Sequence, residues 1–350
     1  MKTLIRLFLL IVPLGLQAQI DTYWIDTTTH KFGDHSYFFT NRPLKVKSKK
    51  GILEFKNKTN KKTDNLYFCL FDYAQDTFLI KYRAKNSSNN YPVEKVENNI
   101  FYKIYDDLRI KKGIKKFSVV IPGYSHTFDD QIYKYMHRVK KTYADSVKHN
   151  MVHLLYAWSD EWRPYRYHSA RTSAIRGAAD FAIFQHMLED FLSDSVFFST
   201  HPKDITFYLT CSSMGNQLLK KYLIKREKQD IPFTKVYKHI LFIGSDASWG
   251  SFEEGKGFDH LNELCDTVTV TWHDNDIPLK ASKSLNFRKR MGLYGPRKPE
   301  NLPGYIKVLD VGEFLVEEDK KGLWHDYLLT NPQLQQMILN GIKEDENVKP

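Results

Sequence analysis

The sequence predicts an α/β protein in which a doubly wound, mostly parallel sheet follows a β-rich N-terminal extension. Three observations favour this class. Strand-like and helix-like segments alternate after residue 116, short β-forming runs occur in the first hundred residues, and no repeat or Pro/Gly/Ser-rich linker divides residues 19–350. Such alternation is typical of a parallel sheet covered by helices on both faces. With 42% hydrophobic and 27% charged residues, the 350-residue chain has the composition of a globular protein.

The first eighteen residues have the pattern of a secretory signal peptide. Basic residues near the start precede an apolar run from Leu7 to Leu16, and Ala18 offers a small residue for cleavage. This run is shorter than the ~20 residues that span a bilayer, and no cysteine follows the cleavage point. We therefore expect a periplasmic or secreted protein without a stable membrane anchor. Residues 19–350 would form a single domain, with a β-rich part at 19–115 and a catalytic core at 116–345.

The β-rich part combines predicted strands with a lysine-rich segment. The strands are expected at residues 36–40, 66–72 and 77–82. Eight lysines between residues 45 and 62 punctuate apolar residues and supply much of the net charge of +11. We interpret this segment as a solvated hairpin whose charges discourage edge-to-edge pairing, with binding to an anionic envelope polymer as the alternative. No nucleic-acid motif accompanies it, so we expect no nucleic-acid partner.

The catalytic core is expected to contain six strands and three main helices. The predicted strands are residues 117–121, 151–158, 205–211, 240–243, 267–272 and 306–311. Apolar residues at three- and four-residue steps predict helices over residues 132–143, 174–191 and 214–225, with a short helix near Leu261. In doubly wound sheets, functional residues collect beyond the carboxyl ends of the strands. Candidate functional residues are therefore expected in the loops that follow the predicted strands.

The segment from Cys211 to Gly215 has the features of a nucleophile elbow. It joins a predicted strand to a predicted helix, with Cys211 two residues before Ser213 and Gly215 two residues after it. Small residues at these positions permit the sharp turn that exposes a serine hydroxyl. Ser213 is therefore the candidate nucleophile, and a purely structural strand-to-helix turn is the alternative.

The neighbours of Ser213 are weaker nucleophile candidates. Ser212 has Met214 rather than glycine two residues after it, and Cys211 belongs to a buried strand where cysteine usually acts as a small hydrophobe. The chain contains three cysteines, Cys69, Cys211 and Cys265. They allow at most one disulfide, and none has zinc-ligand spacing. We expect neither a metal nor a cofactor.

A nucleophilic serine requires an imidazole to accept its proton and a carboxylate to orient that imidazole. After a nucleophile elbow the acid comes first along the chain and the histidine second. His325 follows the last predicted strand and is the candidate base. His239, just before a strand, and His273, directly after one, are less suitably placed.

Two aspartates are candidates for the acid. Asp276 follows the strand at residues 267–272 and is preferred, because a carboxylate there can reach the histidine loop. Asp246, after the strand at residues 240–243, is the alternative acid. Either aspartate could instead cap a turn or a helix.

Stabilisation of an oxyanion requires fixed backbone donors. An elbow supplies one from the residue after the nucleophile, here Met214, and a second comes from a turn after an earlier strand. Tyr124 is the candidate for the second donor, since Gly123 permits close backbone approach. A simple Pro-Gly turn is the alternative interpretation.

These residues resemble an uncharacterised bacterial branch of the α/β-hydrolase superfamily, and the resemblance spans most of residues 36–330. The shared segments are Ile121-Pro122-Gly123-Tyr124, Trp158-Ser159, the Ser213-Met214-Gly215-Asn216 elbow, Thr40-Asn41-Arg42, Asn275-Asp276 and His325-Asp326-Tyr327. The branch has histidine where this chain has Pro122 and Ser212. The resemblance implies the α/β-hydrolase fold and a hydrolase architecture, but no particular substrate.

The leading hypothesis for function is a serine hydrolase that cleaves an ester or related acyl bond through an acyl-enzyme intermediate. Its substrate would be a small molecule or an envelope-derived acyl compound. Two alternatives remain open at this stage: a non-catalytic envelope-binding protein on the same fold, and an acyltransferase that uses the same three side chains.

Overall fold

The computed structural model describes residues 20–24, 35–47, 52–56, 65–73, 77–86, 98–124, 127–128, 132–133, 136–137, 151–159, 164–327, 331 and 334. The predicted signal peptide at residues 1–18 lies outside this part of the chain. So does most of the helix expected at residues 132–143, of which only two short pieces are described.

A ten-stranded sheet forms the centre of the described structure, in the order β1-β6-β5-β2-β8-β7-β9-β10-β11-β12. Its strands are β1 (Ile20–Trp24), β2 (His35–Thr40), β5 (Asn65–Asp72), β6 (Thr77–Asn86), β7 (Lys116–Ile121), β8 (Met151–Ala157), β9 (Thr206–Ser212), β10 (Tyr237–Ile243), β11 (Cys265–Trp272) and β12 (Ile306–Asp310). In the order of the sheet, the strands from β2 to β12 (β2-β8-β7-β9-β10-β11-β12) pair parallel with one another. The strands on the other side of β2 (β1-β6-β5-β2) pair antiparallel. The predicted mostly parallel sheet is confirmed.

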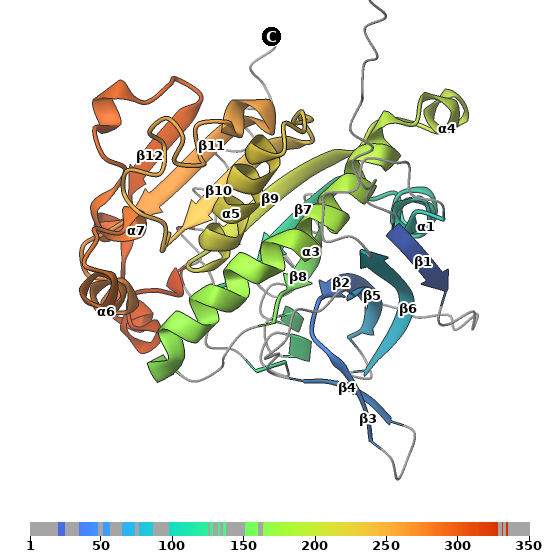
Figure 1. Ribbon diagram of the computed structural model, residues 1–350, viewed down its shortest axis with the longest axis horizontal. Helices are drawn as coiled ribbons and strands as arrows, with labels where there is room; N and C mark the ends of the chain where they lie inside the picture. The colour runs from blue at the N-terminus through green and yellow to red at the C-terminus, as the bar shows by residue number, and fades with distance from the viewer. Residues whose placement is uncertain are drawn as a thin grey trace, which may run out of the picture.

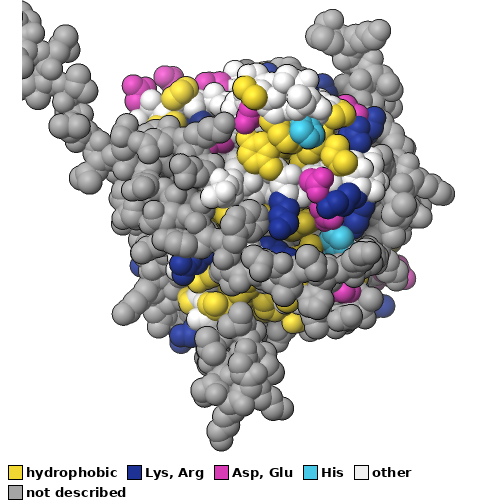
Figure 2. Space-filling model, turned by 90° about the vertical axis from the view of Figure 1, so that its right-hand side faces the viewer, with side chains coloured by type: hydrophobic (Ala, Val, Ile, Leu, Met, Phe, Trp, Pro, Cys, Tyr) yellow, Lys and Arg dark blue, Asp and Glu magenta, His cyan; other side chains and the backbone are white. Residues whose placement is uncertain are grey.

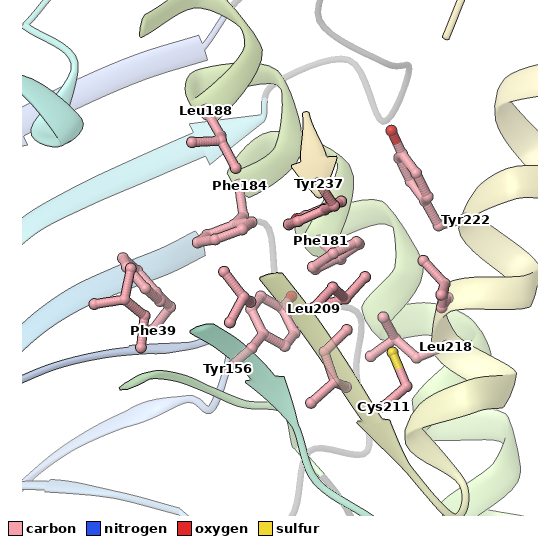
Figure 3. Close-up of a cluster of buried hydrophobic side chains, with 14 of the residues drawn as sticks. Phe39, Tyr156, Phe181, Phe184, Leu188, Leu209, Cys211, Leu218, Tyr222 and Tyr237 are labelled. Carbon is pink, nitrogen blue, oxygen red and sulfur yellow. The ribbon is translucent and has the colours of Figure 1, made fainter. Parts of the chain in front are cut away.

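Two long helices cover the face of the sheet that is turned toward the viewer in Figure 1, α3 (Tyr167–Ser193) and α5 (Gly215–Lys228). Apolar side chains of both helices pack on the central strands, as Figure 3 shows for Phe181 of α3, Leu218 of α5 and Leu209 of β9. Cys211 lies in the same core and is fully buried. Strands covered in this way are apolar along their length rather than alternating, and in β7 five of six residues are buried.

The N-terminal β-rich part extends the sheet instead of forming a separate layer. Strands β1, β6 and β5 continue it beyond β2 by antiparallel pairing. A second, two-stranded sheet is formed by β3 (Leu44–Lys47) and β4 (Ile52–Phe55), which pair antiparallel and project from the N-terminal side of the molecule in Figure 1. This hairpin confirms the hairpin expected in the lysine-rich segment.

Several short helices were not predicted. They are α1 (Ile100–Tyr105), η1 (Asp106–Ile110), η4 (Pro164–Arg166), α4 (Ser195–Thr200), α6 (Ile277–Asn286), α7 (Met291–Tyr294), η6 (Pro299–Asn301), η7 (Gly312–Phe314) and η8 (Glu317–Gly322). The short helix expected near Leu261 is η5 (Leu261–Glu263). Helix α3 starts at Tyr167 rather than at residue 174, and the hydroxyl of Tyr167 in its first turn reaches Asp246 in the loop after β10.

The surface carries charges of both signs. On the face in Figure 2, the coloured Lys and Arg side chains lie beside Asp and Glu side chains and below a group of hydrophobic side chains. The visible coloured part of that face thus has no continuous basic surface, despite the net charge of +11.

None of the helices in the described part of the chain is long and apolar enough to cross a membrane.

Candidate active site

Ser213 occupies a strained turn between β9 and α5. Its backbone φ is +48°, in the left-handed region that a residue with a side chain rarely adopts. The turn is fixed from the β10 side, because the Ser213 N–H donates to the Ile243 carbonyl at 2.8 Å and the Ser213 carbonyl accepts from the Asp246 N–H at 3.1 Å. This is the geometry of a nucleophile elbow, which holds its serine at the carboxyl edge of the sheet.

Two neighbours explain how the chain makes this turn. A Cβ on Gly215 would lie only 2.5 Å from the Ile121 carbonyl oxygen, so glycine is required where α5 begins beside the end of β7. The Asn216 amide donates to the carbonyls of Cys211 and Ser213 at 2.9 and 3.0 Å. Asn216 thereby bridges the end of β9 and the turn, which gives the asparagine of the elbow a structural role.

Cys211 shows why glycine is not needed two residues before the serine. Its side chain is fully buried between the sheet and the helices (Figure 3), away from the turn. Burial raises the pKa of the Cys211 thiol well above its ordinary value. All three cysteines are buried and free, so the disulfide that the sequence allowed is not formed. A buried thiol of raised pKa does not suit a nucleophile.

His325 and Asp276 form a close pair. The Nδ1 atom of His325 lies 2.6 Å from Oδ2 of Asp276, whose side chain is fully buried, while 13% of the His325 side chain remains exposed. The other carboxylate oxygen, Oδ1, accepts the Leu279 N–H at 2.8 Å and caps α6. Asp276 therefore both caps a helix and orients an imidazole, two roles that the sequence had presented as alternatives.

The backbone of Ile243 and Gly244 links the elbow to this pair. Ile243 binds the Ser213 N–H, and a Cβ on the next residue, Gly244, would lie 3.2 Å from Cε1 of His325 and 3.4 Å from Oδ2 of Asp276. Gly244 has a φ of +46°. Consequently Ser213, His325 and Asp276, which are far apart in the sequence, all border one short stretch of backbone at the end of β10.

The loop that carries His325 is strained before the histidine and anchored after it. Leu323 and Trp324 have φ values of +55° and +60°. Two residues beyond His325, the buried Tyr327 hydroxyl accepts the Gly244 N–H at 2.9 Å and hydrogen-bonds Thr271 Oγ1 at 2.6 Å. Sequence reasoning had noted Tyr327 only as part of a resemblance. Its hydroxyl fixes the histidine loop to the ends of β10 and β11.

Asp246, the alternative acid, contacts a different set of groups. Its Oδ2 accepts the Tyr167 hydroxyl at 2.6 Å, and its Oδ1 accepts the Ser282 hydroxyl. The Arg290 Nε atom lies 3.5 Å from the same Oδ1. Burial raises the pKa of Asp246, and the charge of Arg290 opposes that shift. Asp246 acts on His325 through its charge, whereas Asp276 contacts the imidazole directly.

The two alternative histidines, His239 and His273, differ in their distance from the pair. His239 Nδ1 lies 2.7 Å from Thr267 Oγ1, near the start of β10 and thus at the opposite end of the strand from the elbow. His273 is buried, packs edge-on against Tyr327, and has Nε2 4.0 Å from Asp276 Oδ2. Its ring therefore lies beside the pair without the short contact that His325 makes with Asp276.

The Pro122-Gly123-Tyr124 turn lies directly against the serine. A Cβ on Gly123 would lie 2.9 Å from Ser213 Cβ, so only glycine lets the turn approach this closely. The Trp158 indole N–H donates to the Pro122 carbonyl at 2.8 Å and fixes the turn in place. The Tyr124 ring packs edge-on against Tyr167 at 5.7 Å between centroids.

A buried polar network supports Trp158. The Ser159 N–H donates to Asn41 Oδ1 at 2.7 Å, and the Asn41 amide donates to Asp180 Oδ2 at 2.7 Å. Gly177 of α3 is tightly packed here, because a Cβ would lie 3.3 Å from Leu218 Cδ1, with the Asn41 amide nitrogen in ordinary contact at 3.5 Å. Three of the segments that carried the family resemblance, those with Asn41, Pro122 and Trp158-Ser159, thus meet at the Gly123 turn.

The contact with Asp276 changes the pKa of His325. Burial lowers the pKa of His325, but the charge of Asp276 and its hydrogen bond outweigh burial and raise the pKa to about 9, with Asp326 and Asp246 adding to the rise. No group of three or more His, Cys, Asp or Glu side chains in the described residues is arranged to hold a metal ion.

Taken together, the sheet order, the strained serine turn and the histidine–carboxylate pair define an α/β protein with a hydrolase-type site. The chain belongs to the family described as alpha/beta hydrolase of unknown function (DUF900), whose model matches residues 97–341. The predicted superfamily and the α/β-hydrolase fold are confirmed, and the chain is a hydrolase.

Solved structures show distant similarity. An esterase/lipase from an uncultured bacterium is 11% identical with a TM-score of 0.30, over 66% of this chain and 76% of that one. A double mutant of an esterase is 10% identical with a TM-score of 0.25, over 63% and 78% of the two chains. No curated protein matches the sequence.

Proposed function

We propose that the protein is a serine hydrolase that cleaves an ester or related acyl bond through a covalent acyl-enzyme. Ser213 is the nucleophile and His325 the general base. Asp276 is the carboxylate that orients the imidazole and stabilises its protonated form. The backbone N–H groups of Met214 and Tyr124 would bind the oxyanion. The observation that carries the proposal is the 2.6 Å His325–Asp276 contact beside the backbone that also holds the Ser213 turn.

The proposed chemistry has two half-reactions. His325 takes the Ser213 hydroxyl proton as the oxygen attacks the substrate carbonyl, and it then protonates the leaving group as the carbonyl–leaving-group bond breaks. Water, deprotonated by His325, next attacks the acyl carbon, and the Ser213–acyl bond breaks as the proton returns to Ser213. Asp276 remains ionised and stabilises the imidazolium in both steps.

Steady-state and pre-steady-state hydrolysis of 4-nitrophenyl esters tests this function. We expect wild type to release a burst of 4-nitrophenol when deacylation is slower than acylation, and Ser213→Ala to lose at least about 10³-fold in kcat. Ser212→Ala is the matched control and keeps its activity. A Ser213→Ala variant as active as wild type would overturn the assignment.

Product analysis separates the hydrolase from an acyltransferase. We expect free carboxylic acid as the product in water, and little transfer to added alcohols or amines. Predominant acyl transfer would replace the hydrolase proposal by an acyltransferase that uses the same residues. The ordered serine, acid and histidine favour either enzyme over a non-catalytic envelope-binding protein.

The cellular setting is part of the proposal. We infer a periplasmic or secreted protein that acts on a small-molecule or envelope-derived acyl substrate, on the basis of the signal-like residues 1–18. Expression in a bacterial host with determination of the mature N-terminus tests this. Cleavage after Ala18 supports it, and an intact Met1 in a cytoplasmic fraction contradicts it.

A further inference from the structure

Positively charged side chains gather on the α3 and α5 side of the serine turn. They are Arg171, Lys220, Lys256, Arg288 and Arg290, called here the cationic cluster. Lys220 lies on α5, two helical turns after Ser213, and its ammonium donates to Ser251 Oγ at 2.8 Å. Burial, and then the charges of the other four residues, lower the pKa of Lys220 to about 8. Each of the other four cations is therefore close enough to Lys220 to repel its charge.

Arg290 is the buried end of the cluster. Only 2% of its surface is exposed. Its Nη1 donates to the Asp246 carbonyl at 3.2 Å, but Nε and Nη2 make no hydrogen bond, although Nε has an ion-pair contact with Asp246. Buried guanidinium groups normally use their donors, since an unsatisfied buried donor is costly. Arg290 therefore has two buried donor atoms for which the described residues provide no acceptor in hydrogen-bond geometry.

The charges of the cluster are incompletely neutralised. Asp246 interacts with both Arg290 and Arg171, but its oxygens also accept the hydroxyls of Tyr167 and Ser282. Asp246 carries one negative charge against the five positive charges of the cluster, so this carboxylate alone does not neutralise it. Arg171 adds a further buried Nε without a hydrogen-bond partner. A bound anion would relieve both the repulsion and the unsatisfied donors.

Exposure across the cluster is graded. Lys256 and Arg288 are exposed, Arg171 and Lys220 are half-buried, and Arg290 is buried. Charges arranged from the surface inward attract an anion and bind it most strongly where water is excluded. This gradient distinguishes the cluster from a set of separate surface cations.

The cluster is attached to the serine turn. The Asp246 carbonyl binds Arg290, and the Asp246 N–H binds the Ser213 carbonyl. The segment after Arg290 is fixed alongside, since the Gly292 N–H donates to the Ser245 carbonyl at 2.8 Å. Tyr167 connects the same aspartate to the Tyr124 turn.

We propose that the cationic cluster binds a phosphate-type oxyanion that the substrate carries near its scissile acyl bond. This proposal rests on the serine hydrolase function. Arginine forks and an ammonium group suit a tetrahedral oxyanion with several acceptor oxygens. Free inorganic phosphate has the same chemistry, and the two arms of the experiment distinguish it from a group on the substrate.

The first arm measures binding of inorganic phosphate by isothermal titration calorimetry at pH 7. We expect binding to wild type and at least tenfold weaker binding to Lys220→Met, in which one half-buried cation is lost. Lys238→Gln, which removes a lysine near the opposite end of β10, is the matched control and binds phosphate as wild type does. Far-UV circular dichroism verifies folding. Absence of binding to folded wild type, or equal binding to Lys220→Met, overturns the proposal.

The second arm asks whether the anion belongs to the substrate. We expect phosphate to slow the labelling of Ser213 by a fluorophosphonate. We also compare kcat/KM for a 4-nitrophenyl ester that carries a phosphonate with kcat/KM for its neutral analogue. The ratio of the two values should fall at least tenfold in Lys220→Met. Phosphate binding that affects neither labelling nor this ratio identifies a free-phosphate site and overturns the substrate assignment. If wild type binds phosphate through Lys220 but is never labelled, the serine hydrolase function itself fails, and with it the substrate assignment.

Discussion

At the residue scale, the site depends on three backbone positions that tolerate little change. Ser213 is held at a φ of +48°, while Gly123 and Gly215 permit approaches that a Cβ would block at 2.9 and 2.5 Å. Strain of this kind persists only where surrounding contacts impose it. Here those contacts are the hydrogen bonds to Ile243 and Asp246 and the amide of Asn216.

The raised pKa of His325 predicts a pH dependence. The base must be neutral to accept the serine proton. With a pKa of about 9, His325 stays in the protonated, inactive imidazolium form up to a higher pH than an ordinary histidine does. We therefore expect kcat/KM to rise with pH, with a midpoint above 6.5 and near 9. A pH profile of 4-nitrophenyl ester hydrolysis, corrected for spontaneous hydrolysis, measures it. A plateau already reached by pH 6 would contradict this assignment.

Replacement of the two aspartates separates their roles. Asp276→Asn removes the carboxylate that contacts His325, and we expect kcat to fall by about 10³–10⁴-fold. Asp246→Asn should reduce kcat far less and shift the pH midpoint downward, because it removes only a more remote charge. The kinetics of both variants, normalised to folded protein, provide the measurement. A larger loss in Asp246→Asn would make Asp246 the acid.

Sequence reasoning at this scale selected the candidate site residues but not the residues that support them. Ser213, Asp276 and His325 could be selected because each follows a strand in the required order. Tyr327, Tyr167 and Gly244 could not, since the hydrogen bonds of Tyr327 to Gly244 and Thr271 and of Tyr167 to Asp246 join residues 56 to 83 positions apart, which only the folded chain brings together. Arg290 also carried no local pattern that would single it out.

At the scale of elements, loops at the carboxyl edge are connected to buried side chains behind them. Trp158, at the end of β8, reaches the Pro122 carbonyl and is itself fixed through Ser159, Asn41 and Asp180. The turn that carries Tyr124 is thus held by the N-terminal strands as well as by the serine. The β-rich extension therefore contributes to the site and not only to the sheet edge.

Trp158→Phe tests this connection. The variant keeps an aromatic ring in the core but loses the N–H that fixes the Pro122 carbonyl. We expect kcat to fall about tenfold or more with KM less affected, since an oxyanion turn acts mainly in the transition state. The control is Trp249→Phe, whose ring lies under Lys289 and which should leave kcat unchanged. Equal kcat in Trp158→Phe and wild type would refute the connection.

Asn216→Ala tests the support of the elbow. The variant loses two hydrogen bonds to the Cys211 and Ser213 carbonyls, and at about 0.5–1.5 kcal/mol each we expect a loss of about 1–3 kcal/mol in the free energy of unfolding. Activity should fall as well, because the serine turn is less fixed. Urea denaturation together with kcat measures both effects. Unchanged stability and kcat would contradict the bridging role.

The long helices could be predicted, whereas most of the short ones could not. Helices α3 and α5 have 27 and 14 residues, enough for apolar periodicity to show. Helices α1, α4 and α7 have only 4 to 6 residues. Helix α6 carried a usable signal in the Asp276 cap and the proline that follows.

At the scale of the whole molecule, sheet order determines which loops meet. Strand β7 lies between β8 and β9, and β9 pairs with β10, so the loops after β7, β9 and β10 adjoin at one edge. Alternation of strands and helices predicts a parallel sheet but not this order, which depends on crossovers. For the same reason, the antiparallel joining of β1, β6 and β5 to the parallel part could not be derived from the local patterns.

The most direct measurement of the central claim is to locate the residue that an active-site fluorophosphonate modifies. Intact-mass and peptide mass spectrometry of labelled wild type should show one adduct, on the peptide that contains Ser213. Labelling should vanish in Ser213→Ala, persist in Ser212→Ala, and slow strongly in His325→Ala. An adduct on another residue, or no adduct on well-folded wild type, would contradict the assignment of Ser213 as a nucleophile activated by His325 and Asp276.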